Sequence, residues 1–231
     1  MQNRLKSTKN IFMETISKLK DVYRKICVKS CVFFDYLGKK IAKTGLSANW
    51  ITLLGLLVGL LAMNFVAMRM YASAILCILI NRFFDGLDGA VARCAKPSDF
   101  GVFLDTICDY IFYAGIIFGF ALANPEQNAV CAAFLLFAFT VAAVVMLAYA
   151  MIAYKKSKAV YISLNNSPFY LWGFAQGAET FIAVLLLCLL PSFFVVIAIF
   201  FGVLSLIKAV GLMVSAYYSF EISEKARGNE K

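Results

Sequence analysis

The chain has 231 residues, of which 62% are hydrophobic and 15% are charged, and its formal net charge is +9. This composition leaves too little polar surface for a soluble domain of that length, so the expected class is an all-α integral membrane protein. The sequence contains no histidine, which excludes a Ser-His-Asp triad, a histidine base and the commonest metal ligand.

Residues 1–45 form a basic segment. It carries eleven lysines and arginines against only Glu14, Asp21 and Asp35. Apolar side chains recur at steps of three and four residues between Phe12 and Ile26, which predicts an amphipathic helix. Such a helix typically lies on an anionic membrane face, and we expect it there. A solvated arm that binds nucleic acid is the alternative; we expect no nucleic-acid partner.

Six hydrophobic segments follow, and each is long enough to cross a hydrocarbon core. The basic connections alternate with nearly uncharged ones, so the positive-inside bias predicts that both termini are cytoplasmic. We expect a domain at 46–220 and a short cytoplasmic tail at 221–231. The six segments lie at about 50–67, 70–92, 102–123, 129–153, 168–190 and 193–219.

Four carboxylates lie where the second predicted segment ends and the third begins. Asp85 and Asp88 are three residues apart, and Asp105 and Asp109 are four apart, so each pair shares one helix face. A short connection makes the two helices antiparallel neighbours, and their carboxylates should converge near the cytoplasmic boundary. Unpaired charges are costly at that depth, and divalent cations remove the cost. Ligation by oxygen alone indicates Mg²⁺, Mn²⁺ or Ca²⁺, and Mg²⁺ is the usual ion with a phosphate substrate. We expect Mg²⁺, with Mn²⁺ as the alternative and two ions at a diphosphate.

The surrounding residues fit a phosphate substrate. Gly86 and Gly89 remove side chains beside the first two aspartates, which lets a phosphate or another helix approach the backbone. Gly101 does the same one turn before Asp105. Arg93 is placed to bind a phosphate oxygen with two N–H groups.

These residues carry a resemblance to a known family. The run Asp85-x-x-Asp88-Gly89-x-x-Ala92-Arg93, followed by Gly101-x-x-x-Asp105-x-x-x-Asp109, resembles the signature of the CDP-alcohol phosphatidyltransferases of class I. One departure concerns the loop: seven residues separate Arg93 from Gly101, where the family usually has eight. A small, uncharacterised bacterial subgroup shares this shorter spacer and is similar to most of the membrane region.

The resemblance implies a role for each matching residue. Asp85, Asp88 and Asp105 would bind the metal ions with Asp109 beside them, and Asp109 would also be the general base. The nucleotide pocket would be lined by Asn49, Thr52, Gly89, Ala92, Arg93, Ser98 and Gly101. Helix capping is the rival explanation for Asn49 and Thr52.

The implied reaction moves a phosphatidyl group from CDP-diacylglycerol to a small alcohol and releases CMP, as part of phospholipid biosynthesis. The alternative within the family is transfer from CDP-choline or CDP-ethanolamine to diacylglycerol. The resemblance also implies a homodimer in a bacterial inner membrane, with the active site on the cytoplasmic side. A transporter is the rival class, and the clustering of the acids at one membrane face argues against it.

Three further charged residues keep open roles. Glu179 and Lys208 lie inside apolar segments, where they would pair with each other or orient the acceptor. Arg82, one turn before Asp85, would balance the acidic cluster or bind an acceptor phosphate.

Overall fold

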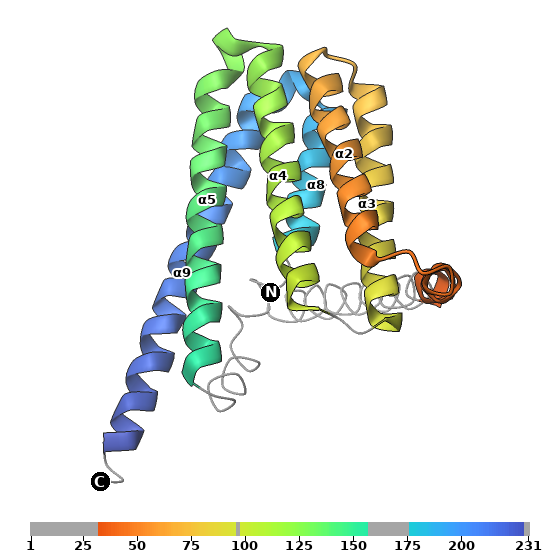
Figure 1. Ribbon diagram of the computed structural model, residues 1–231. Coiled ribbons are helices and arrows are strands. Elements are labelled where there is room, and N and C mark those ends of the chain that lie inside the picture. The colour runs from red at the N-terminus through yellow and green to blue at the C-terminus, as the bar shows by residue number, and fades with distance from the viewer. Residues whose placement is uncertain (1–31, 96–97, 157–175, 229–231) are drawn as a thin grey trace, which may run out of the picture. The chain divides into compact units, whose positions relative to one another are not determined.

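The computed structural model describes residues 32–95, 98–156 and 176–228, and every regular element in these ranges is helical. The elements labelled in Figure 1 are α2 (Ala48–Ala67), α3 (Tyr71–Cys94), α4 (Asp99–Ala123), α5 (Pro125–Lys156), α8 (Gln176–Leu189) and α9 (Phe194–Gly228). A single 3₁₀ turn, η1 (Pro191–Phe193), joins the last two. Residues 32–42 are also helical. Most of the predicted amphipathic segment 1–45 lies outside the described ranges.

Four of the described helical stretches are long and apolar enough to cross a membrane: Ala48–Ala67, Asp99–Ala123, Pro125–Ile152 and Pro191–Tyr218. They confirm four of the six predicted segments. The segment predicted at 70–92 is the helix α3. Every stretch of 18 residues within α3 contains Arg82, Asp85 and Asp88, so this helix is more highly charged than the four apolar ones. The described part of 168–190 is the 14-residue helix α8. Six spans therefore stay a prediction.

By their contacts the residues divide into two compact units. The first consists of Met1–Gly55 with Asn81–Cys108, and the second of Leu56–Ile80 with Asp109–Lys231. The division passes through α2, α3 and α4, so each of these helices contributes residues to both units.

The first unit has a small apolar core around Ile51, Leu87 and Val91, against which Phe34, Leu37, Ile41, Ala48 and Phe84 pack. The helical stretch 32–42 ends in a turn at Gly45, whose φ of 79° is readily adopted by glycine. Ser47 then begins α2, because its Oγ accepts a hydrogen bond from the N–H of Asn49 at 3.3 Å. The turn at Gly45 and the cap at Ser47 let α2 begin a few residues after the stretch 32–42.

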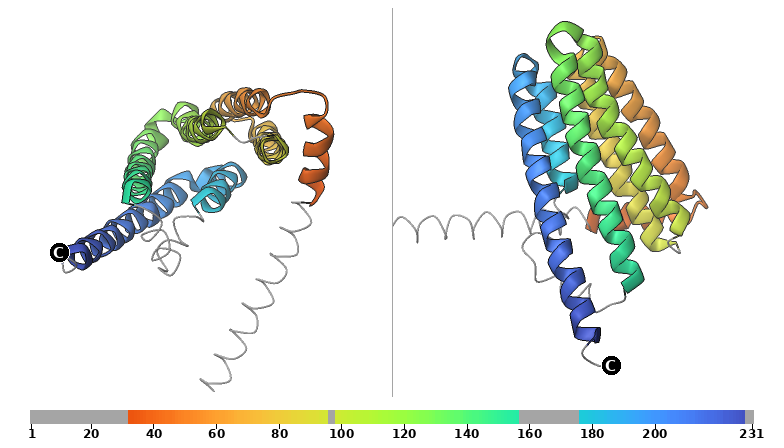
Figure 2. Two further views of the ribbon diagram at one scale, coloured as in Figure 1. Left: turned by 60° about the horizontal axis from the view of Figure 1, so that its bottom comes forward. Right: turned by 90° about the vertical axis from the view of Figure 1, so that its left-hand side faces the viewer.

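The second unit has the larger core. Its fully buried members include Phe112, Ile116 and Phe120 of α4 together with alanines from other helices, such as Ala74 and Ala198. Small residues allow close approach of helices, which stabilises packing where lipid removes the hydrophobic drive between them. Here α5 and α9 run side by side, and α8 turns through η1 into α9 (Figures 1 and 2).

The turn between α2 and α3 is closed by Arg69. This residue has a φ of 60°, and its Nε and Nη2 donate to the carbonyl oxygen of Ala123 at 2.9 and 2.6 Å. The last carbonyls of a helix lack partners within it, so the guanidinium satisfies the C-terminal end of α4. Pro125 then occupies the first position of α5, where its missing N–H costs nothing.

Candidate functional site

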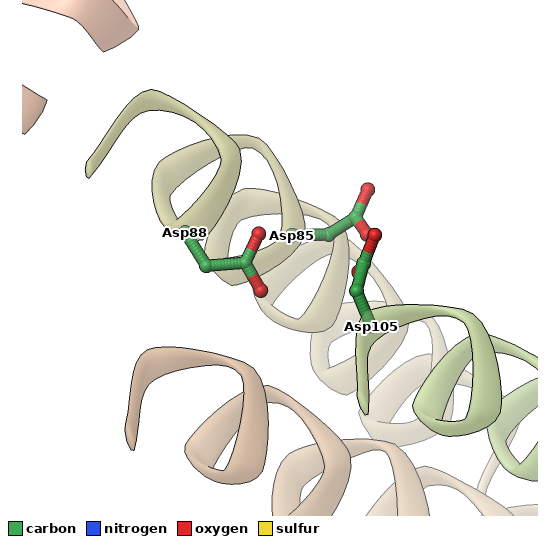
Figure 3. A group of neighbouring side chains, drawn as sticks. All are labelled: Asp85, Asp88 and Asp105. Atoms are coloured by element: carbon green, nitrogen blue, oxygen red, sulfur yellow. The ribbon is translucent and has the colours of Figure 1, made fainter. Parts of the chain in front are cut away.

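Three of the four predicted aspartates come together in the first unit. One carboxylate oxygen from each of Asp85, Asp88 and Asp105 lies within 4.8 Å of the other two. Figure 3 shows that Asp85 and Asp88 extend from α3 and that Asp105 reaches them from α4. Among the described residues this is the group of carboxylates suited to hold a metal ion. The predicted convergence of these three side chains is present.

Asp88 is the most enclosed of the three. Its side chain is buried, and its Oδ2 accepts a hydrogen bond of 2.6 Å from the hydroxyl of Thr52, which is also buried. The same hydroxyl oxygen lies 3.1 Å from the carbonyl oxygen of Ala48. A hydroxyl has one proton, and the shorter contact to a charged acceptor is the stronger. Thr52 thus fixes the orientation of the Asp88 carboxylate.

Asp85 is oriented by a chain of polar groups that runs from α3 to α2. Arg82 Nη1 lies 3.4 Å from Asp85 Oδ2, while its Nε and Nη2 donate to Asn81 Oδ1 at 3.0 and 2.8 Å. Asn81 is buried and donates through Nδ2 to the carbonyl oxygen of Gly55 at 2.8 Å. Of the two roles left open for Arg82, this contact supports the balancing of the acidic cluster.

Three residues expected at the nucleotide lie together where α4 begins. Ser98 Oγ accepts a hydrogen bond of 3.0 Å from the N–H of Gly101, so Ser98 caps α4. A Cβ at Gly101 would lie 3.1 Å from that oxygen and 3.3 Å from Asn49 Oδ1. Gly101 therefore allows two polar side chains to approach the helix backbone. The N-terminal cap of α2 is Ser47, and Thr52 lies inside that helix with its hydroxyl on Asp88.

The other expected nucleotide residues follow the aspartates on α3. A Cβ at Gly89 would meet only the Nη1 of Arg93, at 3.4 Å, so the backbone at Gly89 is open apart from this guanidinium. Arg93 Nη2 in turn donates to Asp35 Oδ1 at 3.0 Å. Ala92 is partly buried. Gly86 serves a different purpose, because a Cβ there would lie 2.8 Å from the ring of Phe34. It admits another helix rather than a phosphate.

Asp109 belongs to the second unit. It is partly buried and follows Asp105 by four residues on the same helix, α4. Lys208 lies on α9 with its side chain partly buried. Glu179 is part of α8, but its side chain lies outside what the structure describes, so the suggested pairing with Lys208 stays a prediction.

The donor set fits a hard divalent cation. Three carboxylates so close together repel one another, and each offers an oxygen, the ligand that Mg²⁺ and Mn²⁺ prefer. Thr52 lies beside the carboxylate of Asp88 and Arg82 beside that of Asp85, and these donors set the orientation of the two ligands. The structure therefore presents an oriented all-oxygen site.

Sequence reasoning did not single out Asn81 or Asp35. Asn81 begins a buried hydrogen-bond chain, and a lone amide in an apolar helix is a signal for such a chain. Asp35 pairs with Arg93, which lies 58 positions away, and no local spacing in the sequence predicts that contact.

Comparison with known proteins places these residues in context. A family model described as CDP-alcohol phosphatidyltransferase matches residues 46–216. The inner membrane protein YnjF of Escherichia coli is 42% identical over 162 residues, which cover 70% of this chain and 79% of that protein. An archaetidylinositol phosphate synthase of Pyrococcus horikoshii is 37% identical over 91 residues, 39% of this chain and 48% of that protein. No solved structure matches.

Proposed function

The chain belongs to the CDP-alcohol phosphatidyltransferase family, and from this premise we propose that it transfers a phosphatidyl group from CDP-diacylglycerol to a small alcohol. CMP is the second product. The observation that carries the proposal is the cluster of Asp85, Asp88 and Asp105, because three of the four signature aspartates of the resemblance are the carboxylates that converge.

Asp85, Asp88 and Asp105 would hold two Mg²⁺ ions, with Asp109 one turn further along α4. Bound divalent cations supply charge neutralisation at the diphosphate and at the departing nucleotide. Thr52 and Arg82 keep the carboxylates of Asp88 and Asp85 in place, which lowers the cost of ordering the site when the cations bind.

The chemical step follows from the remaining residues. Asp109 takes the proton of the acceptor hydroxyl, and the acceptor oxygen attacks the phosphorus that carries diacylglycerol. The bond between that phosphorus and the bridging oxygen breaks, and CMP leaves with the electron pair. Arg93 binds the phosphates, and Asn49, Gly89, Ala92, Ser98 and Gly101 line the nucleotide pocket.

The setting suits one lipid substrate and one soluble substrate. The chain has several helices apolar enough to span a membrane, and one relative is an inner membrane protein. In the proposal the domain 46–220 spans a bacterial inner membrane as a homodimer. Both termini and the active site lie on the cytoplasmic side. A relative named archaetidylinositol phosphate synthase motivates the inclusion of inositol phosphate among the candidate acceptors.

The test is CMP release by the purified full-length protein with CDP-diacylglycerol, Mg²⁺ and a panel of acceptors: glycerol 3-phosphate, inositol, inositol phosphate, serine and choline. We expect one acceptor to give CMP and lipid product in equal amounts, with loss of both in EDTA and in Asp109→Asn. Asp99→Asn is the matched control, because it removes an exposed carboxylate from the first turn of α4.

Two results would contradict parts of the proposal. Release from CDP-choline with diacylglycerol, and none from CDP-diacylglycerol, would assign the alternative reaction of the family. Full activity of Asp109→Asn would remove Asp109 from the role of general base.

A further inference from the structure

An ion pair outside the acidic cluster joins the stretch 32–42 to α3. Arg93 Nη2 donates to Asp35 Oδ1 at 3.0 Å, and both side chains are roughly half exposed. A pair this exposed to solvent contributes little to stability, so its effect on the fold is small. The ion pair matters for another reason: it involves Arg93, the residue proposed to bind the phosphates.

The residues on either side of Asp35 along its helix pack tightly against α3. The ring of Phe34 sits on Gly86, where a Cβ would come within 2.8 Å of the ring. One turn later Gly38 lies against Ala90, and a Cβ there would come within 2.8 Å of the Ala90 backbone. Residues 34 and 38 thus pack on residues 86 and 90 at matched helical steps, and this packing fixes Asp35 relative to Arg93.

The bond to Asp35 leaves most of the guanidinium for another ligand. A guanidinium has five N–H groups in a rigid fork, and Asp35 accepts from Nη2. The other terminal nitrogen, Nη1, lies over Gly89, 3.4 Å from the place of a Cβ. Gly89 directly follows Asp88, so the guanidinium lies beside the turn that carries this aspartate.

We infer that Asp35 is a positioning residue that holds the guanidinium of Arg93 over Gly89, ready to bind a phosphate oxygen of the CDP-alcohol. The inference rests on the proposed function, since it takes the nucleotide diphosphate as the ligand of Arg93. Ordering a long side chain before the ligand arrives removes that entropy cost from binding. The effect should therefore fall on substrate affinity.

The experiment measures CMP release by the purified full-length protein while CDP-diacylglycerol is varied at saturating acceptor and Mg²⁺. In Asp35→Asn we expect KM for CDP-diacylglycerol to rise about 3- to 10-fold, with kcat changed less than about 2-fold. Asp35→Glu should restore most of the affinity, because a longer carboxylate still reaches the guanidinium. Asp99→Asn, which removes one exposed negative charge from the same unit, should leave KM unchanged.

A second measurement makes the inference independent of turnover. The affinity for CDP in Mg²⁺, followed by isothermal titration calorimetry, should weaken about 3- to 10-fold in Asp35→Asn. In an Arg93→Gln background the same substitution should have no further effect, because no guanidinium is then left for Asp35 to hold.

The outcomes separate the inference from the proposed function. If the wild-type protein releases no CMP with any acceptor, the proposed function fails, and the CDP titration still decides the role of Asp35. Unchanged KM and CDP affinity in Asp35→Asn would overturn the inference. Tighter binding in that variant would also overturn it, because Asp35 would then compete with the phosphate for Arg93.

Discussion

The hydroxyl of Thr52 lies 2.6 Å from Oδ2 of Asp88, and both side chains are buried. This contact joins α2 to α3 within the first unit, at the most enclosed carboxylate of the acidic cluster. Because the hydroxyl donates, it stabilises the ionised form of Asp88, which is the form that binds a cation.

Thr52→Val should therefore weaken metal binding while keeping the size of the side chain. We expect the Mg²⁺ concentration for half-maximal CMP release to rise about 10- to 100-fold, the usual effect of removing a partner of a metal ligand. Thr52→Ser should remain close to wild type. Thr140→Val is the control, because that hydroxyl donates to the carbonyl oxygen of Leu136 within the same helix, α5. An unchanged Mg²⁺ requirement in Thr52→Val would show that Asp88 does not depend on this bond.

Gly89→Ala should separate activity from stability. A Cβ there meets only the Arg93 guanidinium at 3.4 Å, and alanine is favoured over glycine inside a helix by about 1 kcal/mol, so thermal stability should hold or rise. CMP release should nevertheless fall about 10-fold or more, because the methyl group would stand where the nucleotide is proposed to lie. Full activity would exclude Gly89 from the nucleotide pocket.

Whereas Gly89→Ala should lower activity, Gly38→Ala should lower stability. Its Cβ would come within 2.8 Å of the Ala90 backbone, which cannot move as a side-chain end can. We expect a loss of about 1–3 kcal/mol in the free energy of unfolding. A thermal melt of the purified protein in detergent checks this, and a wild-type midpoint would contradict the close approach of residues 38 and 90.

Two substitutions of Arg69 can separate the destabilising effect of its positive φ from the stabilising effect of its hydrogen bonds to the end of α4. Arg69→Ala loses two hydrogen bonds to Ala123 and keeps the φ of 60°, so we expect a loss of about 2 kcal/mol or more. Arg69→Gly loses the same bonds and relieves the strain, so its melting temperature should lie between those of wild type and Arg69→Ala. The reverse order of the two variants would contradict this account.

Gly115 and Gly119 form a matched pair on α4. A Cβ at Gly119 would lie 2.7 Å from the carbonyl oxygen of Met63, whereas a Cβ at Gly115 would lie 3.5 Å from the Met63 sulfur. Gly119→Ala should lower the free energy of unfolding by about 1–3 kcal/mol. Gly115→Ala should be neutral or stabilising by up to about 1 kcal/mol, and equal effects would show that the helices do not meet as closely at Gly119.

The acidic cluster could be predicted because its information is local. Spacings of three residues place Asp85 and Asp88 on one face of a helix, and a short connection returns the chain so that Asp105 meets them. The helical class and four of the spans follow from composition and run length in the same way. Local periodicity is thus sufficient for elements and for carboxylates close in sequence.

Contacts between distant segments could not be predicted. The resemblance associates Thr52 with the nucleotide, and its bond to Asp88 spans 36 positions that no helical period encodes. The same holds for Asp35 and Arg93, and for the role of Gly86 as a seat for Phe34. Run length predicts a span at 70–92, but the charges that form the site leave α3 outside the helices that are apolar enough to span, so this span stays a prediction.

The seating of Phe34 on Gly86 also limits how this enzyme can be recombined with its relatives. A chimera that takes its first 45 residues from one homologue and the rest from another receives position 34 from the first protein and position 86 from the second. A side chain at position 86 would leave the incoming aromatic ring no place, and a small residue at position 34 would leave a void above the glycine. Positions 34 and 86 must therefore be exchanged as a unit, and a crossover point after residue 95 respects this where one near residue 45 does not.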